Sequence, residues 1–245
     1  MIGARSIRGA ILPLFLLCSW EGTSRAGLQP GEMLSRPSDI VMATLTSIAD
    51  GSILLATIQT FETALLGLCI ATLLGVLVGT VLGLSPVLER VTGPTIEALR
   101  PIPAVAFIPL SLMVFGFGVG LEASIVTYAC VWPILLITIS AVRSIEPRLL
   151  EVARMMEFSA AQCLWKVILP AAFARINVGL RVATGIALVV AVTTEVVLNP
   201  RGLGYNLVLA QQSLNVALMY AQLVWLCGLG YLLNAALRLS AWRTA

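Results

Sequence analysis

The segment TIQTFETALLGLCIATLLGVLVGTVLGL, Thr57–Leu84, decides the fold of this chain. About 20 apolar residues in a helix cross the roughly 30 Å hydrocarbon core of a membrane. This run is longer than a perpendicular crossing requires, so we expect it to tilt or to extend beyond the bilayer. Small residues recur every four positions along it, at Gly67, Ala71, Gly75, Gly79 and Gly83. We interpret this stripe as a face on which another helix packs closely, and not as a binding site.

Five further apolar runs flank this segment. The 245 residues are 59% hydrophobic and 11% charged, whereas a soluble domain carries about 25% charged residues. The six candidate spans are Gly9 to about Arg25, Thr57–Leu84, Ile102–Phe117, Ala123–Val142, Val178–Leu198 and Val216–Leu237. The sequence therefore predicts an all-α, polytopic membrane protein whose residues 1–245 form one transmembrane domain.

The first of these runs allows two interpretations. Glu21 follows its apolar part, and Arg5 and Arg8 precede it, as in a signal peptide. We expect a retained span, because no convincing cleavage site of small residues precedes a soluble domain.

The placement of charge orients the six spans. With both termini in the cytoplasm, twelve basic residues lie inside and only Arg25, Arg36 and Arg201 lie outside. The twelve are Arg5, Arg8, Arg90, Arg100, Arg143, Arg148, Arg154, Lys166, Arg175, Arg181, Arg238 and Arg243. This excess obeys the positive-inside rule.

Composition excludes several classes of function. The chain has no histidine, which excludes histidine-containing zinc sites and nucleophiles activated by histidine. The five cysteines, which we interpret as small packing residues, form no CxxC pair. The net charge of +3 comes without a basic run, so we expect no nucleic-acid partner. We expect no metal and no cofactor.

Prolines crowd the third and fourth spans, at Pro101, Pro103, Pro109 and Pro133. Each lacks a backbone N–H and discourages a straight helix. Two interpretations stay open, a kinked helix within the bundle and a broken helix beside a pore.

The pattern of residues 143–177, the cytoplasmic loop between the fourth and fifth spans, predicts two short amphipathic helices. In the first, Leu149, Val152, Ala153 and Met156 share an apolar face. The second ends or kinks at Pro170. An apolar face on such a loop needs a cover: the membrane surface, the chain's own spans or a partner protein.

These residues carry a family resemblance. Glu151-Val152-Ala153, followed by Ile168-Leu169-Pro170-Ala171-Ala172, resembles the E-A-A … I-x-L-P loop of binding-protein-dependent ABC importer permeases. The match covers nearly the whole chain. Further similarities point to the nitrate, sulfonate and taurine branch: Trp20-Glu21, Arg36-Pro37-Ser38, Arg100-Pro101-Ile102-Pro103 and Gly202-Leu203-Gly204-Tyr205.

The resemblance implies partners and a place in the bacterial inner membrane. The loop would dock an ATP-binding subunit through Glu151, Val152, Ala153, Arg154, Glu157, Leu169 and Pro170. A second permease subunit, expected to be an identical copy, would complete the pore, and a periplasmic or extracellular binding protein would deliver the solute. The chain's only lysine, Lys166, follows no glycine-rich phosphate loop, so the chain itself is no ATPase.

Glu157 departs from the family pattern, which has glycine there. A glycine can take the left-handed conformation that ends a helix sharply, and a residue with a Cβ loses roughly 1 kcal/mol in doing so. We expect either a different turn or a compensating contact of Glu157.

Glu195 is the candidate for the outer mouth of the translocation path. It extends a stripe of small residues on the fifth span, beside Thr193 and Thr194. A carboxyl group within a membrane is costly unless it faces an interior or water. The alternative is a carboxylate at the interface that contacts loop backbone or Arg201.

The sequence thus predicts an importer permease for a small solute, and the resemblance implies an anion such as nitrate, a sulfonate or taurine. Another solute, for example a pyrimidine-type vitamin precursor or bicarbonate, fits the same architecture. From a different class, a membrane scaffold would dock its partner without transport. An intramembrane enzyme would need a cluster of catalytic groups that the spans lack.

Overall fold

A computed structural model describes residues 3–26 and 34–241. The regular elements of this part of the chain are all helical. They are α1 (Gly3–Arg25), α2 (Pro37–Ala49), α3 (Ser52–Leu84), α4 (Pro86–Leu99), the 3-10 helix η1 (Ala104–Phe107), α5 (Ile108–Phe115), α6 (Val119–Arg143), α7 (Pro147–Met155), α8 (Ala160–Cys163), the π-helix η2 (Leu164–Ile168), α9 (Leu169–Val197), α10 (Gly202–Gln212) and α11 (Val216–Ala241).

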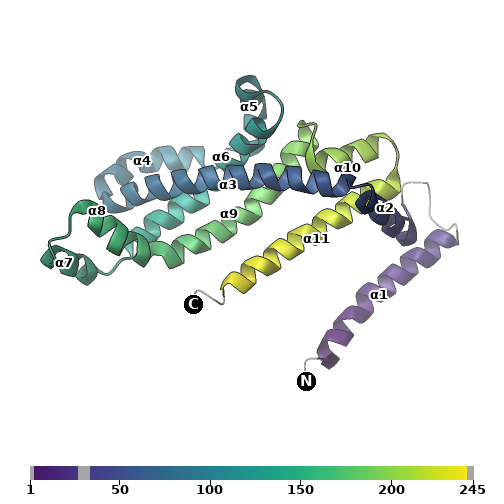
Figure 1. Ribbon diagram of the computed structural model, residues 1–245, viewed down its shortest axis with the longest axis horizontal. Coiled ribbons are helices and arrows are strands. Elements are labelled where there is room, and N and C mark those ends of the chain that lie inside the picture. Colours follow the sequence, from purple (N-terminus) through teal and green to yellow (C-terminus); the bar gives the residue numbers. More distant parts are fainter. Residues whose placement is uncertain (1–2, 27–33, 242–245) are drawn as a thin grey trace.

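Helices α3, α6 and α9 pack together as the core of the molecule (Figure 1). The glycines of the α3 stripe, Gly67, Gly75, Gly79 and Gly83, all lie against α6. A Cβ at Gly67 would stand 2.6 Å from the Cβ of Val126, and one at Gly79 would stand 2.7 Å from that of Thr138. The two backbones therefore approach so closely that a Cβ at any of these four glycines would push them apart.

Within residues 3–26 and 34–241, four helical stretches are long and apolar enough to cross a membrane: Ser52–Leu84, Val119–Arg143, the run Ala160–Gln212 and Val216–Leu237. Helix α1 is not among them, because charged Arg8 and Glu21 bound its apolar middle. The count of six spans stays a prediction. Arg243, which contributes to the expected cytoplasmic charge, lies outside the described residues.

The third expected span, 102–117, does not form one straight helix. Helix α4 and the segment 104–115 meet at an angle of 86°, and together they would make a fifth span. The break falls at Pro101 and Pro103, which lack the backbone N–H that a continuous helix uses. The carbonyl of Leu99 lies at this break, where it accepts from the N–H of Ile102 at 3.2 Å and from the hydroxyl of Tyr128 at 2.6 Å. The helix is therefore broken here, and its place beside a pore stays a prediction.

The outer surface of α3 is apolar over most of its length, and Glu62, which pairs with Arg201, is the one charged residue of this helix. Leu65, Leu73 and Leu77 are each more than half exposed. Large contiguous apolar surfaces are rare on soluble monomers, whereas a bilayer accepts them. This surface therefore faces lipid or another subunit.

Candidate coupling loop and outer polar cluster

Helix α7 lies in the loop that joins α6 to α9. Ala153 is buried, whereas Val152 is 53% and Met155 85% exposed. The apolar face expected for this helix is therefore divided between two surroundings. Its Ala153 side packs on the chain, and its Val152 side faces outward together with the exposed Glu151 and Arg154.

The turn after α7 is the one that a glycine would make. Glu157 has a φ of 52°. Its N–H donates to the carbonyl of Arg154 at 3.0 Å, and the N–H of Phe158 donates to that of Ala153 at 3.1 Å. These two bonds form a Schellman motif with Glu157 in the left-handed position. The turn therefore does not differ, and in the described part of the chain Glu157 has no salt bridge to compensate it.

The second half of the loop is continuous with α9. It begins with a capping box: the amide of Gln162 donates to the Ser159 hydroxyl, and the Ser159 amide donates to the Gln162 side chain. Of the two outcomes expected at Pro170, an end or a kink, the helix does not end there, and a π-helical turn precedes the proline. In the π-helical turn, the N–H of Leu169 bonds the carbonyl of Leu164, one residue further back than in an α-helix. Pro170 follows this wider turn directly, and the helix continues through it without a break.

The opposite end of the molecule holds an outer polar cluster around the start of α10. The first amides of a helix have no partner within it. Here the N–H groups of Gly202 and Leu203 donate to the side chains of Gln59 and Thr60 on α3, each at 3.0 Å. The N–H of Gly204 donates to Oε2 of Glu195 on α9, at 2.8 Å. Side chains of two core helices thus replace the cap that α10 lacks.

Two residues that the sequence analysis did not single out complete this cluster. Asn199 accepts from the amide of Gly118 at 2.9 Å and donates to the carboxyl group of Glu122. Both Asn199 and Glu122 are fully buried. The signal for Glu122 was a carboxyl group one residue before the predicted fourth span; Asn199 carried none.

The three candidates for the path are mostly enclosed. Thr194 is fully buried, Glu195 is 2% exposed, and Thr193 is partly buried. The Thr193 and Thr194 hydroxyls donate to the carbonyl groups of Val189 and Val190 within their own helix. Glu195 contacts backbone in the first turn of α10, through the Gly204 amide, and the choice between the two interpretations of Glu195 stays a prediction.

Comparisons with known proteins agree on one family. Residues 71–241 match the family described as binding-protein-dependent transport system inner membrane component. A putative aliphatic sulfonates transport permease of Bacillus subtilis is 28% identical over 95% of this chain and 84% of its own length. The taurine transport system permease of Escherichia coli is 29% identical over 91% and 83%. A putative aliphatic sulfonates permease of Escherichia coli is 31% identical over 93% and 87%.

Solved structures show the same fold. An inward-facing structure of the MetNI methionine ABC transporter matches with a TM-score of 0.66 at 20% identity, over 76% of this chain and 93% of that one. An amino acid ABC transporter crystallised with histidines matches with a TM-score of 0.64 at 18% identity, over 81% and 97%.

Proposed function

The chain belongs to the family of binding-protein-dependent transport system inner membrane components, and from this premise we propose how it works as an importer subunit. It is the transmembrane permease subunit of an ABC importer. We propose that two copies form the pore, that the loop containing α7 couples it to a separate ATP-binding subunit, and that a binding protein delivers the solute.

The exposed face of α7 carries the coupling proposal. Val152 and Met155 present bare apolar surface beside exposed Glu151 and Arg154, on a helix whose other side is anchored by buried Ala153. Exposed apolar surface rimmed by charged residues is typical of a protein interface. Glu157 shapes the end of this helix, while Leu169 and Pro170 belong to the continuous helix behind it.

The coupling proposal is tested by Val152→Arg combined with Met155→Arg. Both side chains are exposed, so the fold should persist, whereas Ala153→Arg would disrupt the packing of α7 itself. Loss of a central interface contact costs about 2 kcal/mol, or roughly thirtyfold in affinity. We expect the ATP-binding subunit to be lost in co-purification, and solute uptake with it.

The control is Leu214→Arg, which adds one arginine at an exposed leucine beyond α10. This variant should leave the co-purification of the ATP-binding subunit unchanged. Normal co-purification and uptake in the α7 double variant would contradict the docking assignment.

The proposed orientation has both termini and α7 in the cytoplasm, and α10 outside. It is supported by the basic residues around α7 and by the small number of basic residues near α10. In this orientation α10 faces the incoming binding protein. Labelling of intact cells with a membrane-impermeant thiol reagent tests it in two variants, Ser213→Cys and Arg148→Cys, because both positions are exposed. Only the Ser213→Cys variant should gain a label over the wild type.

We propose a small anion as the solute. Similar proteins are described as permeases for aliphatic sulfonates, taurine, nitrate and bicarbonate. Uptake of labelled sulfonate, taurine, nitrate and bicarbonate by the reconstituted importer with its own binding protein discriminates among them. Uptake only of a compound without an anionic group would contradict the proposal.

We further propose that the break between α4 and η1 borders the translocation path, and that Glu195 and Thr194 support the path without lining it. Non-helical backbone at membrane depth is tolerated only where protein or water surrounds it. Glu195 is instead engaged with the Gly204 amide.

A further inference from the structure

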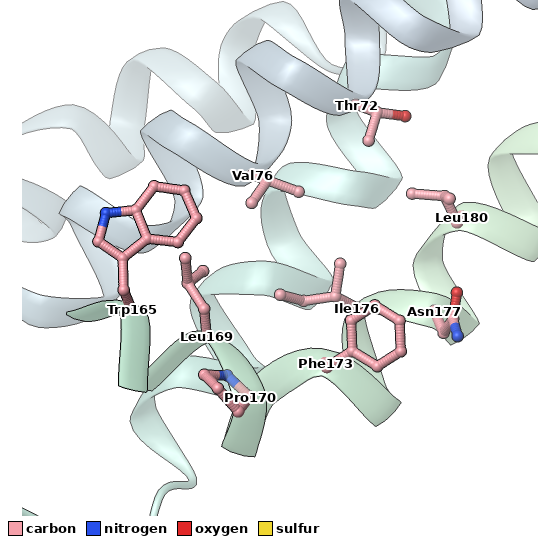
Figure 2. A pocket seen from close by; sticks show the side chains of 9 residues that line it. All are labelled: Thr72, Val76, Trp165, Leu169, Pro170, Phe173, Ile176, Asn177 and Leu180. Carbon is pink, nitrogen blue, oxygen red and sulfur yellow. The ribbon is translucent and has the colours of Figure 1, made fainter. Parts of the chain in front are cut away.

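An apolar groove runs between α3 and the helix formed by η2 and α9. It has two adjoining cavities, of about 450 Å³ and 390 Å³, which share the walls Thr72, Val76, Trp165 and Leu169. Figure 2 shows the first cavity, with Trp165 and Leu169 directed toward Val76 and with Phe173, Ile176 and Leu180 further along α9. Trp165 stands between the two cavities and is 70% exposed.

The lining selects an apolar occupant. None of the residues that line either cavity is charged, and Thr72, Thr80 and Asn177 are the uncharged polar ones. The Thr72 hydroxyl already donates to the carbonyl of Leu68 at 2.7 Å. The second cavity opens onto Leu73, Leu77 and Val81, all more than half exposed on the apolar face of α3. The groove is therefore continuous with the membrane-facing surface of the protein.

The length of the groove matches one lipid chain. Its α3 wall extends from Thr72 to Leu84, which at 1.5 Å per residue is about 18 Å. One leaflet contributes about half of the roughly 30 Å hydrocarbon core. A single extended acyl chain would fill such a groove along its length.

Charge selects the head group. Lys166 directly follows Trp165, and its Nζ lies 5.3 Å from the centre of the Phe158 ring, on the loop side of the groove. Arg175 lies on the α9 wall between Phe173 and Ile176 and is exposed. Tryptophan beside lysine or arginine is typical of the membrane interface.

We propose that this groove binds one acyl chain of an anionic phospholipid of the cytoplasmic leaflet, with the phosphate within reach of Lys166. The proposal rests on the orientation given above and not on transport itself. Because Trp165 and the π-helical turn lie within the second half of the coupling loop, a bound lipid would also fix the position of that loop relative to α3.

The test measures lipid bound to the purified full-length chain by native mass spectrometry, during titration with phosphatidylglycerol or phosphatidylcholine. One nearby cation contributes a preference of about fivefold for the anionic lipid. Val76→Phe fills the groove and should lower the occupancy of both lipids about fivefold or more. Leu74→Phe, on the same helix but outside the groove, should leave it unchanged. Lys166→Gln should remove only the preference for phosphatidylglycerol.

Leu73→Trp fills the groove from its exposed rim and replaces Val76→Phe if that variant does not fold. Equal occupancy in the filled and control variants would overturn the proposal. The proposal would also be overturned if a second copy of the chain covered the groove. In that case the groove-filling variants would convert dimers to monomers without changing the amount of bound lipid. Uptake is measured separately, so a failure of transport leaves the lipid result independent.

Discussion

The outer polar cluster and the coupling loop satisfy the backbone hydrogen bonds of their helix ends in different ways. Both contain a non-helical turn beside a helix end, with one residue in the left-handed region: Gly202 with a φ of 87° and Glu157 with a φ of 52°. Around Gly202 the helix-start amides are bonded by side chains of α3 and α9. Around Glu157 the bonds are made by backbone alone, and the neighbouring side chains are exposed.

The difference indicates what each end does. The helix-start amides of the outer cluster find their acceptors within the chain, so that end holds α10 rigidly on the core. The loop leaves apolar side chains such as Met155 uncovered. Its contacts are completed only by another molecule, as our proposal of a docked ATP-binding subunit requires.

The largest expected effect comes from Gly202→Ala. A Cβ there would overlap the carboxyl group of Glu195, and the positive φ disfavours any side chain. Overpacking and backbone strain together should lower the free energy of unfolding by about 3 kcal/mol. Thermal unfolding in detergent, followed by circular dichroism, measures this.

The control is Gly185→Ala in α9, where a Cβ would meet nothing within 4 Å. It should be neutral or slightly stabilising, because alanine favours the helix. Equal unfolding temperatures of the two variants would contradict the claim that the outer polar cluster holds α10 rigidly on the core.

A smaller effect separates the two interpretations of Glu195. Glu195→Leu leaves the Gly204 amide buried without an acceptor, which should cost about 2 kcal/mol of unfolding free energy. Glu195→Gln keeps an oxygen for that amide and should retain both stability and uptake. An unfolding temperature unchanged in Glu195→Gln but with uptake abolished would assign the carboxylate to the path instead.

The sequence predicted the parts of the fold that depend on local pattern. The glycine stripe predicted a close helix partner for α3, and the apolar runs predicted helices that the structure contains at 52–84, 119–143 and 216–241. Prolines mark where a helix loses a donor, but not what neighbouring structure replaces it. Hence Pro101 and Pro103 fall at a true break, whereas Pro170 is absorbed by a π-helical turn.

The outer cluster was harder to predict, because its bonds join residues far apart in the chain. Glu195 was identified from its place on a helical stripe, yet its acceptor role depends on how α10 folds back. Asn199 and Glu122 meet only in three dimensions. The first helix of the coupling loop was easier, because the spacing of its apolar residues is a local pattern. The turn after it was predicted wrongly, since Glu157 takes the left-handed conformation without a salt bridge in the described residues.

The smallest expected effect concerns the turn after α7 in the coupling loop. Glu157→Gly should relieve the left-handed strain and stabilise the end of α7 by up to about 1 kcal/mol. The extra freedom of glycine in the unfolded chain offsets part of this gain. Slower amide hydrogen exchange at Phe158, whose N–H closes the Schellman motif, measures it. Glu157→Gln keeps the Cβ and should exchange like the wild type. If the glutamine variant also slowed exchange, the charge of Glu157, rather than its backbone conformation, would be what destabilises this turn.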